Sequence, residues 1–183
     1  MNNIYIQQCI PFVMTVFDEE DAEKEAYDIE YFVMKPLFDN IQENYDIGLL
    51  YYPGSGFDSV PKDILGIDRV VHVSLEEQNM LAENYFSKLG GGMKVRADYR
   101  AQIFKETSFD ATLLYGIPMH SAIAALPEFR RVTKPDGLII VEPTKIYGER
   151  IQPKFIRAEM RKYFEPVRRK LWQGPFVIYK NKK

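Results

Sequence analysis

A glycine-rich turn is the first feature of the sequence that could do chemistry. The apolar residues 49–53 lead directly into Gly54, Ser55 and Gly56. Glycines carry no β-carbon, so a ligand can approach the backbone closely at the end of a strand, where doubly wound α/β folds bind cofactors. The alternative is a tight strand-to-helix connection that binds nothing.

The sequence has few histidine and cysteine residues that could bind a metal or act in catalysis. The chain has only His72, His120 and Cys9, and their spacing matches no zinc or iron–sulfur motif. The sequence also has neither a Gly-x-x-x-x-Gly-Lys-Ser/Thr phosphate loop nor a Gly-x-Ser-x-Gly elbow. His120 follows a predicted strand, where an imidazole suits a general base. The alternative is a histidine that simply caps a helix.

Short apolar runs alternate with helical stretches from residue 46 onward. They predict strands near residues 47–52, 69–74, 93–97, 111–115 and 138–141, and helices near residues 60–65, 76–89 and 121–132. Such alternation is typical of a mostly parallel sheet, and the continuous apolar character predicts strands buried on both faces. Residues 134–137, Lys-Pro-Asp-Gly, predict a turn before the fifth strand.

The two ends of the chain have patterns of their own. The acids at 18–21 suit a helix start, and a helical span is expected from there to about residue 44. Its apolar stripe, residues 31, 34, 38 and 41, should pack in the core, with a kink or division at Pro36. At the other end, a helix over residues 153–164 precedes apolar runs at 167–172 and 176–179. Gln173 and Gly174 between these runs predict a hairpin turn. The length of 183 residues predicts one domain, with residues 1–45 as a helical arm or lid and 46–183 as the α/β core.

These features resemble the class I, Rossmann-like S-adenosylmethionine-dependent methyltransferases. Their first motif is an acid followed by three alternate glycines, and Gly54 and Gly56 match the first two. Tyr52 stands in place of the acid and Asp58 in place of the third glycine. Residues 126–141 closely follow the helix, turn and fifth strand of the family. The resemblance implies a doubly wound α/β fold with a mostly parallel seven-stranded sheet and a C-terminal antiparallel hairpin.

The resemblance also implies S-adenosylmethionine as the cofactor. The acid that accepts from the ribose hydroxyls falls at Ser74, with Glu76 or Glu77 as the alternative. Asp98 corresponds to the residue that accepts from the adenine amino group, or else is a turn residue. The implied cofactor contacts are Tyr52, Gly54, Ser55, Gly56, Ser74, Glu76, Asp98, Tyr99, Tyr115 and Gly116, with His120 as the candidate catalytic residue.

The sequence is compatible with three functions. The first is a methyltransferase that acts on a small molecule or an unidentified acceptor. The second is a catalytically inactive methyltransferase-like binding module, because Tyr52 and Ser74 replace two acids. The third is another nucleotide-binding enzyme, such as a NAD-dependent oxidoreductase, which a parallel sixth strand would favour. Residues 116–120 lack the Asn/Asp-Pro-Pro-aromatic motif of enzymes that methylate nucleic-acid amines, so the sequence disfavours that activity.

Charge is distributed unevenly along the chain. Residues 1–46 carry 11 acids and 2 bases, whereas residues 145–183 carry 12 bases and 3 acids. The two ends could pack together, the basic end could bind a polyanion, or both could be solvated faces. No stacking-aromatic motif accompanies the bases, which predicts only modest, salt-sensitive affinity for nucleic acid. The lack of a long apolar run, of a signal segment and of a cysteine pair predicts a cytoplasmic protein without a membrane span.

Overall fold

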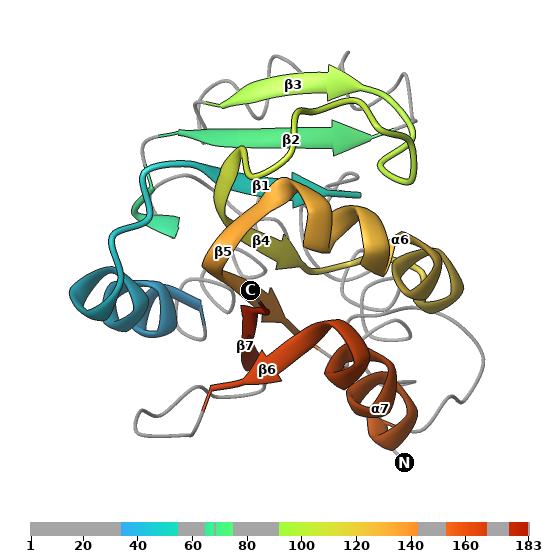
Figure 1. The fold of residues 1–183 in the computed structure, drawn as a ribbon. Helices are drawn as coiled ribbons and strands as arrows, with labels where there is room; N and C mark the ends of the chain where they lie inside the picture. Colours follow the sequence, from blue (N-terminus) through green and yellow to red (C-terminus); the bar gives the residue numbers. More distant parts are fainter. Residues whose placement is uncertain are drawn as a thin grey trace, which may run out of the picture.

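The computed structural model describes residues 34–54, 65–67, 69–74, 92–142, 153–167 and 176–182. These residues form a seven-stranded sheet in the order β3-β2-β1-β4-β5-β7-β6 (Figure 1). Residues 34–44 form a helix that precedes the sheet. The other elements are β1 (Leu50–Pro53), β2 (Val70–Ser74), β3 (Met93–Arg96), β4 (Phe109–Leu114), α6 (Met119–Val132), β5 (Thr133–Val141), α7 (Pro153–Tyr163), β6 (Phe164–Pro166) and β7 (Val177–Asn181).

The sheet is parallel in its first part and antiparallel at its end. Strands β3, β2, β1, β4 and β5 pair in parallel. Strand β7 runs antiparallel between β5 and β6, with Ile139 opposite Tyr179. The predicted fold class, including the antiparallel C-terminal hairpin beside the fifth strand, is confirmed. The parallel sixth strand expected of a NAD-dependent oxidoreductase is absent from the described part of the chain.

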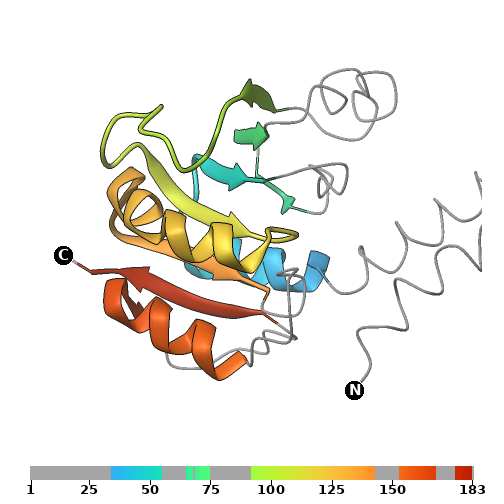
Figure 2. The same ribbon diagram turned by 90° about the vertical axis from the view of Figure 1, so that its right-hand side faces the viewer.

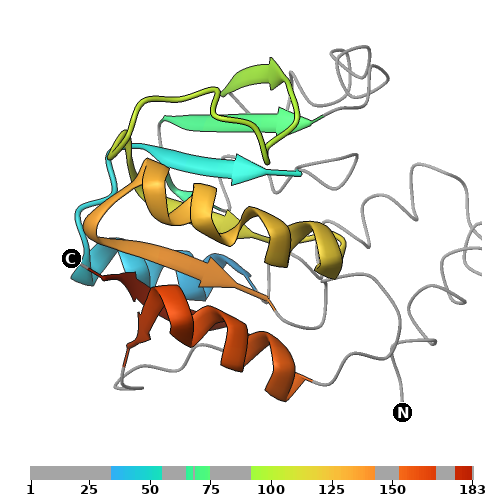
Figure 3. The same ribbon diagram turned by 45° about the vertical axis from the view of Figure 1, so that its right-hand side comes forward.

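Helices cover both faces of this sheet. Figures 2 and 3 show α6 and α7 on one face and the helix of residues 34–44 on the other. Successive strand residues point to opposite faces, so Tyr51 packs toward α6 whereas Leu50 and Tyr52 pack toward the first helix. In that helix the predicted apolar stripe is buried, with Met34 and Phe38 each at most 1% exposed. Both faces are therefore apolar, as the strand composition predicts.

Strand β5 begins earlier than predicted. The sequence predicts a turn over residues 134–137, but β5 starts at Thr133, which pairs with Phe109. The next pair is Leu138 opposite Ala111. Between these two pairs β5 therefore advances by five residues while β4 advances by two. Asp136 has a φ of 62° within this excursion. The Pro-Asp-Gly segment is thus an irregularity inside the strand, which resumes its pairing beyond it.

The C-terminal hairpin also has different bounds. Its first described strand is β6, which ends at Pro166, and of the predicted run 167–172 only Val167 lies within the described residues. The predicted helix end at Phe164 is wrong because Phe164 is fully buried and pairs with Asn181 as the first residue of β6. The backbone N–H of Val167 still donates to the carbonyl of Ile178 at 2.9 Å. The predicted turn at residues 173–174, the predicted helix at residues 76–89 and, apart from Leu65, the predicted helix at residues 60–65 lie outside the described residues.

No helix within the described ranges is long and apolar enough to cross a membrane.

Candidate cofactor site

The carboxyl ends of the five parallel strands meet at one edge of the sheet, which we call the carboxyl edge (Figure 3). Hydrogen bonds between adjacent strands fix the position of the chain just beyond their carboxyl ends. The N–H of Gly54 donates to the carbonyl of Val73 at 2.7 Å, and that of Ala97 donates to Ser74 at 3.1 Å. The predicted contacts that follow β1, β2, β3 and β4 are therefore brought to the same edge, where doubly wound folds bind ligands.

Gly54 occupies a turn that requires glycine. Its φ is +64°, a backbone conformation that L-residues with side chains rarely adopt. A β-carbon here would lie 3.0 Å from Cγ1 of Ile117 and 3.5 Å from Cε1 of Tyr99. The turn after β1 thus packs directly against the segments after β3 and β4. Its glycine is needed by the protein itself as well as by any ligand.

Tyr99 and the start of α6 form the wall beside this turn. Tyr99 is 9% exposed, and its ring centroid lies 6.1 Å from that of Phe129 on α6. Burial raises the pKa of Tyr99, and a hydrogen bond with Ser121 opposes this shift. The predicted contact at Tyr99 is therefore a mostly buried phenol anchored to the first turn of α6.

Gly116 and His120 lie where β4 passes into α6. Gly116 has a φ of +69°, and no atom lies within 4 Å of the position that a β-carbon would take. His120 is exposed in the first turn of α6, two residues after the N-cap residue Pro118. This part of the edge therefore combines open space next to the backbone with an accessible imidazole.

Asp98, the predicted adenine contact, is already engaged by an arginine. Nε and Nη2 of Arg100 donate to its carboxylate, with Nη2 at 2.6 Å from Oδ2. The backbone N–H of Arg100 donates to Oδ1 at 2.9 Å. These hydrogen bonds hold the pKa of Asp98 below its ordinary value. Asp98 thus makes the local contacts expected of a turn residue and its carboxylate stays ionised at neutral pH, whereas its role as an adenine contact stays a prediction.

Two other predicted contacts have their side chains in the core. Tyr52 is fully buried, with its ring 5.3 Å from that of His72. Tyr115 is 4% exposed and stacks on Phe176 at 6.3 Å. Both side chains belong to the apolar cluster that faces the helix of residues 34–44. Only the backbone at these positions is close to the candidate site.

The remaining predicted contacts are Ser74, Ser55, Gly56 and Glu76. Ser74 ends β2 half-buried, opposite Arg96 in the register of β3. Ser55, Gly56 and Glu76 lie outside the described residues, so their assignment stays a prediction.

Sequence reasoning missed two charged residues at this edge. Arg100 pairs with Asp98, and the signal was an arginine two residues after an acid in a predicted turn. Glu142 follows β5 and is 3% exposed, with its N–H donating to the carbonyl of Leu114 at 3.1 Å. The sequence pattern that could have identified Glu142 is an acidic residue directly after an apolar strand. Glu142 is a buried carboxylate where β4 and β5 end.

The sheet order, the terminal hairpin and the glycine turn at the carboxyl edge define a class I methyltransferase-like fold. The sequence matches no protein-family model and no curated protein. Solved structures nevertheless share the fold. The PH0226 protein from Pyrococcus horikoshii has a TM-score of 0.66 at 16% identity, over 85% of this chain and 91% of that chain.

Two further structural neighbours are methyltransferases by name. The N-methyltransferase NodS from Bradyrhizobium japonicum has a TM-score of 0.58 at 10% identity, over 91% of this chain and 100% of its own. A second NodS structure is a complex with S-adenosyl-L-homocysteine. A SAM-dependent methyltransferase from Methanosarcina mazei has a TM-score of 0.54 at 13% identity, over 78% of this chain and 97% of its own. These likenesses establish a class I methyltransferase-like fold.

Proposed function

We propose that this protein binds S-adenosylmethionine at the carboxyl edge and transfers its methyl group to a small-molecule acceptor. The observation that carries the proposal is the pair of glycines with positive φ, Gly54 after β1 and Gly116 after β4, on adjacent strands of a methyltransferase-like sheet. Gly116 leaves space at the backbone, which is what close approach of a cofactor needs. The NodS complex with S-adenosyl-L-homocysteine supports the choice of ligand.

The residues at this edge fit such a cofactor in part. When bound, S-adenosylmethionine supplies a methyl group activated by a sulfonium. The bound cofactor would contact the backbone at Gly54 and Gly116, and Tyr99 would form an apolar wall of its site. His120, exposed at the start of α6, would accept a proton from the acceptor. The chain's main contribution would be to align the acceptor with the methyl group, since proximity and orientation supply much of the rate in such transfers.

A second candidate function is a binding module without catalysis, and the Asp98–Arg100 pair favours it. Both carboxylate oxygens of Asp98 accept hydrogen bonds from Arg100. An adenine amino group could use Asp98 only by competing with Arg100. Ser74 offers a hydroxyl in place of the ribose-binding carboxylate. A site with these substitutions would bind the cofactor weakly or serve another ligand.

Calorimetric titration with S-adenosylmethionine, S-adenosyl-L-homocysteine and NAD tests these functions. If the cofactor uses this edge, Ser74→Asp should tighten S-adenosylmethionine binding by roughly tenfold, because it adds one charge-assisted hydrogen bond. Arg100→Gln should also tighten it, because Asp98 becomes available to the adenine. Lys105→Gln is the matched control for Arg100→Gln, since it removes an exposed cation from a loop before β4 and should leave affinity unchanged.

The outcomes separate the candidates. Binding by the wild type, together with gains in both variants, supports the methyltransferase. If neither the wild type nor Ser74→Asp binds at millimolar concentrations, the binding module replaces the enzyme. Saturable binding of NAD alone would instead favour the oxidoreductase. The role of residues 1–45 as a helical arm or lid and the cytoplasmic location remain predictions from the sequence.

A further inference from the structure

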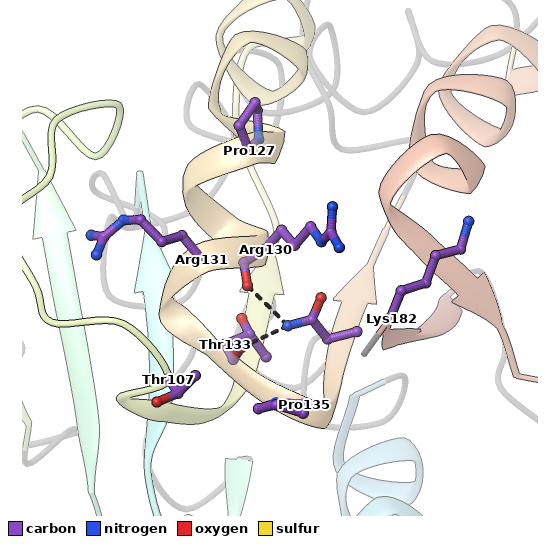
Figure 4. A pocket seen from close by; sticks show the side chains of 8 residues that line it. Thr107, Pro127, Arg130, Arg131, Thr133, Pro135 and Lys182 are labelled. Carbon is purple, nitrogen blue, oxygen red and sulfur yellow. Dashed lines mark hydrogen bonds between the residues drawn. The ribbon is translucent and has the colours of Figure 1, made fainter.

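A hollow lies at the opposite edge of the sheet from the candidate cofactor site. It has a volume of about 290 Å³ and is open to solvent. Its walls come from the loop before β4, the C-terminal turn of α6, the start of β5 and the end of β7 (Figure 4). Because β4 and β5 begin here, this is the amino edge of the parallel strands. We call the hollow the amino-edge cavity.

The charged side chains that line this cavity are all cationic. They are Arg130, Arg131 and Lys182, and no described carboxylate is part of the lining. Arg131 is occupied, because it donates to Glu128 and to the carbonyl of Phe104, each at 2.6 Å. The cavity therefore has two cations besides Arg131 to offer a ligand.

Arg130 and Lys182 have no carboxylate partner among the described residues. Arg130 is exposed, and Nζ of Lys182 donates to the backbone carbonyl of Arg161 at 2.7 Å, which leaves its charge uncompensated by an acid. Figure 4 shows Arg130 and Lys182 directed to the α7 side of α6, and Arg131 directed to the opposite side. Two cations thus reach the same side of the cavity.

Backbone carbonyls at the end of α6 would normally repel an anion, because the C-terminus of a helix carries partial negative charge. Here donors already cover them. Nδ2 of Asn181 donates to the carbonyls of Arg130 at 2.9 Å and Thr133 at 2.7 Å. The N–H of Thr107 donates to the carbonyl of Arg131 at 2.9 Å. The negative end of the helix is therefore masked where the cations gather.

We propose that the amino-edge cavity is an anion site that takes a phosphate group, with Arg130 and Lys182 as its charged donors. A phosphate offers the multiple acceptor oxygens that guanidinium and ammonium groups bind best. The basic C-terminal quarter adds to the field, since Arg157 and Arg161 are exposed on the neighbouring helix α7. The phosphate belongs either to a small molecule or to a nucleic-acid backbone. The proposal does not depend on methyl transfer at the other edge.

Titration of the full chain with inorganic phosphate at low salt, followed by NMR, tests this site. We expect saturable binding in the millimolar range, with Arg130→Gln and Lys182→Gln each weakening it by about fivefold. Lys162→Gln is the matched control. It removes the same charge from an exposed lysine on α7 that pairs with Glu159 and does not line the cavity. It should change the affinity by less than about twofold.

Two results would overturn the proposal. One is the absence of saturable phosphate binding, and the other is an equal loss of affinity in Lys162→Gln, which would show a general charge effect. A single-stranded RNA oligonucleotide then identifies the source of the phosphate. If RNA displaces inorganic phosphate from the wild type, and Arg130→Gln weakens RNA binding, the site takes backbone phosphates. If phosphate saturates the cavity without competition from RNA, the site takes a small phosphorylated ligand. S-adenosylmethionine binding should be unchanged in Arg130→Gln, so the two edges are tested separately.

Discussion

His72 makes the stability of this protein depend on pH. It lies in β2 and is 9% exposed, with its ring facing Tyr52. Gly92 packs so closely on it that a β-carbon there would lie 2.9 Å from Cδ2 of His72. Burial, together with the nearby charge of Lys94, lowers the pKa of His72 from 6.5 to about 4. The folded protein therefore keeps this imidazole neutral at pH values where an unfolded chain would protonate it.

The sign of the effect follows from these two pKa values. Between pH 6.5 and about 4 the unfolded chain binds a proton that the folded chain does not, so stability falls as the pH is lowered. The whole difference corresponds to about 3 kcal/mol of unfolding free energy. By about pH 5, roughly 2 kcal/mol of it should be lost relative to about pH 7.5.

Urea denaturation at these two pH values measures the loss. His72→Phe removes the titrating group, so its unfolding free energy should fall by roughly 2 kcal/mol less than that of the wild type over this range. His120→Phe is the matched control, because it removes an exposed histidine and should keep the wild-type dependence. If His72→Phe and the wild type lose the same stability, the buried imidazole is not the cause. The reasoning from burial would then be refuted.

Other substitutions test the backbone of the two edges. Asn181→Ala should lower the unfolding free energy by about 2–3 kcal/mol in urea denaturation, because the carbonyls at the end of α6 lose their donor. An unchanged midpoint would contradict that role. Gly116→Ala should cost about 1 kcal/mol from its positive φ alone, and should weaken S-adenosylmethionine binding by calorimetry if the cofactor passes this backbone. Gly54→Ala should cost more stability than Gly116→Ala, because its β-carbon also meets Ile117, and equal losses would contradict the packing.

The sequence was sufficient for the order of the elements and less so for their ends. Apolar runs predicted the five parallel strands and the hairpin because strands buried on both faces leave continuous apolar segments. Phe164 shows the limit of that approach. In the sequence, a phenylalanine that follows a helical pattern is indistinguishable from a residue of the last helical turn. Phe164 begins β6 because it pairs with Asn181, which the sequence pattern does not reveal. Thr133 likewise joins β5 through its pairing with Phe109, which lies on the neighbouring strand β4 and is distant in the sequence.

The candidate site was predictable where one residue type decides the backbone. Gly54 is such a case, because its positive φ excludes most other residues. The roles of Asp98 and Tyr52 were not, since each depends on a partner that spacing does not reveal. Asp98 is held by Arg100 through a turn, and Tyr52 points into the core. The amino-edge cavity was missed because its cations come from α6 and from the C-terminal end of the chain.

The two edges of the sheet therefore differ in the chemistry they offer. At the carboxyl edge, Tyr52 and Ser74 carry no charge, and Asp98 is compensated by Arg100. S-adenosylmethionine carries a sulfonium that S-adenosyl-L-homocysteine lacks, and carboxylates near a ligand favour the cationic form. With these three positions neutral or paired, the proposed cofactor binding would rest, at the described residues, on backbone approach and apolar contact. Discrimination between the two ligands would then have to come from Glu142, the buried carboxylate where β5 ends, or from residues that reach this edge from outside the described ranges.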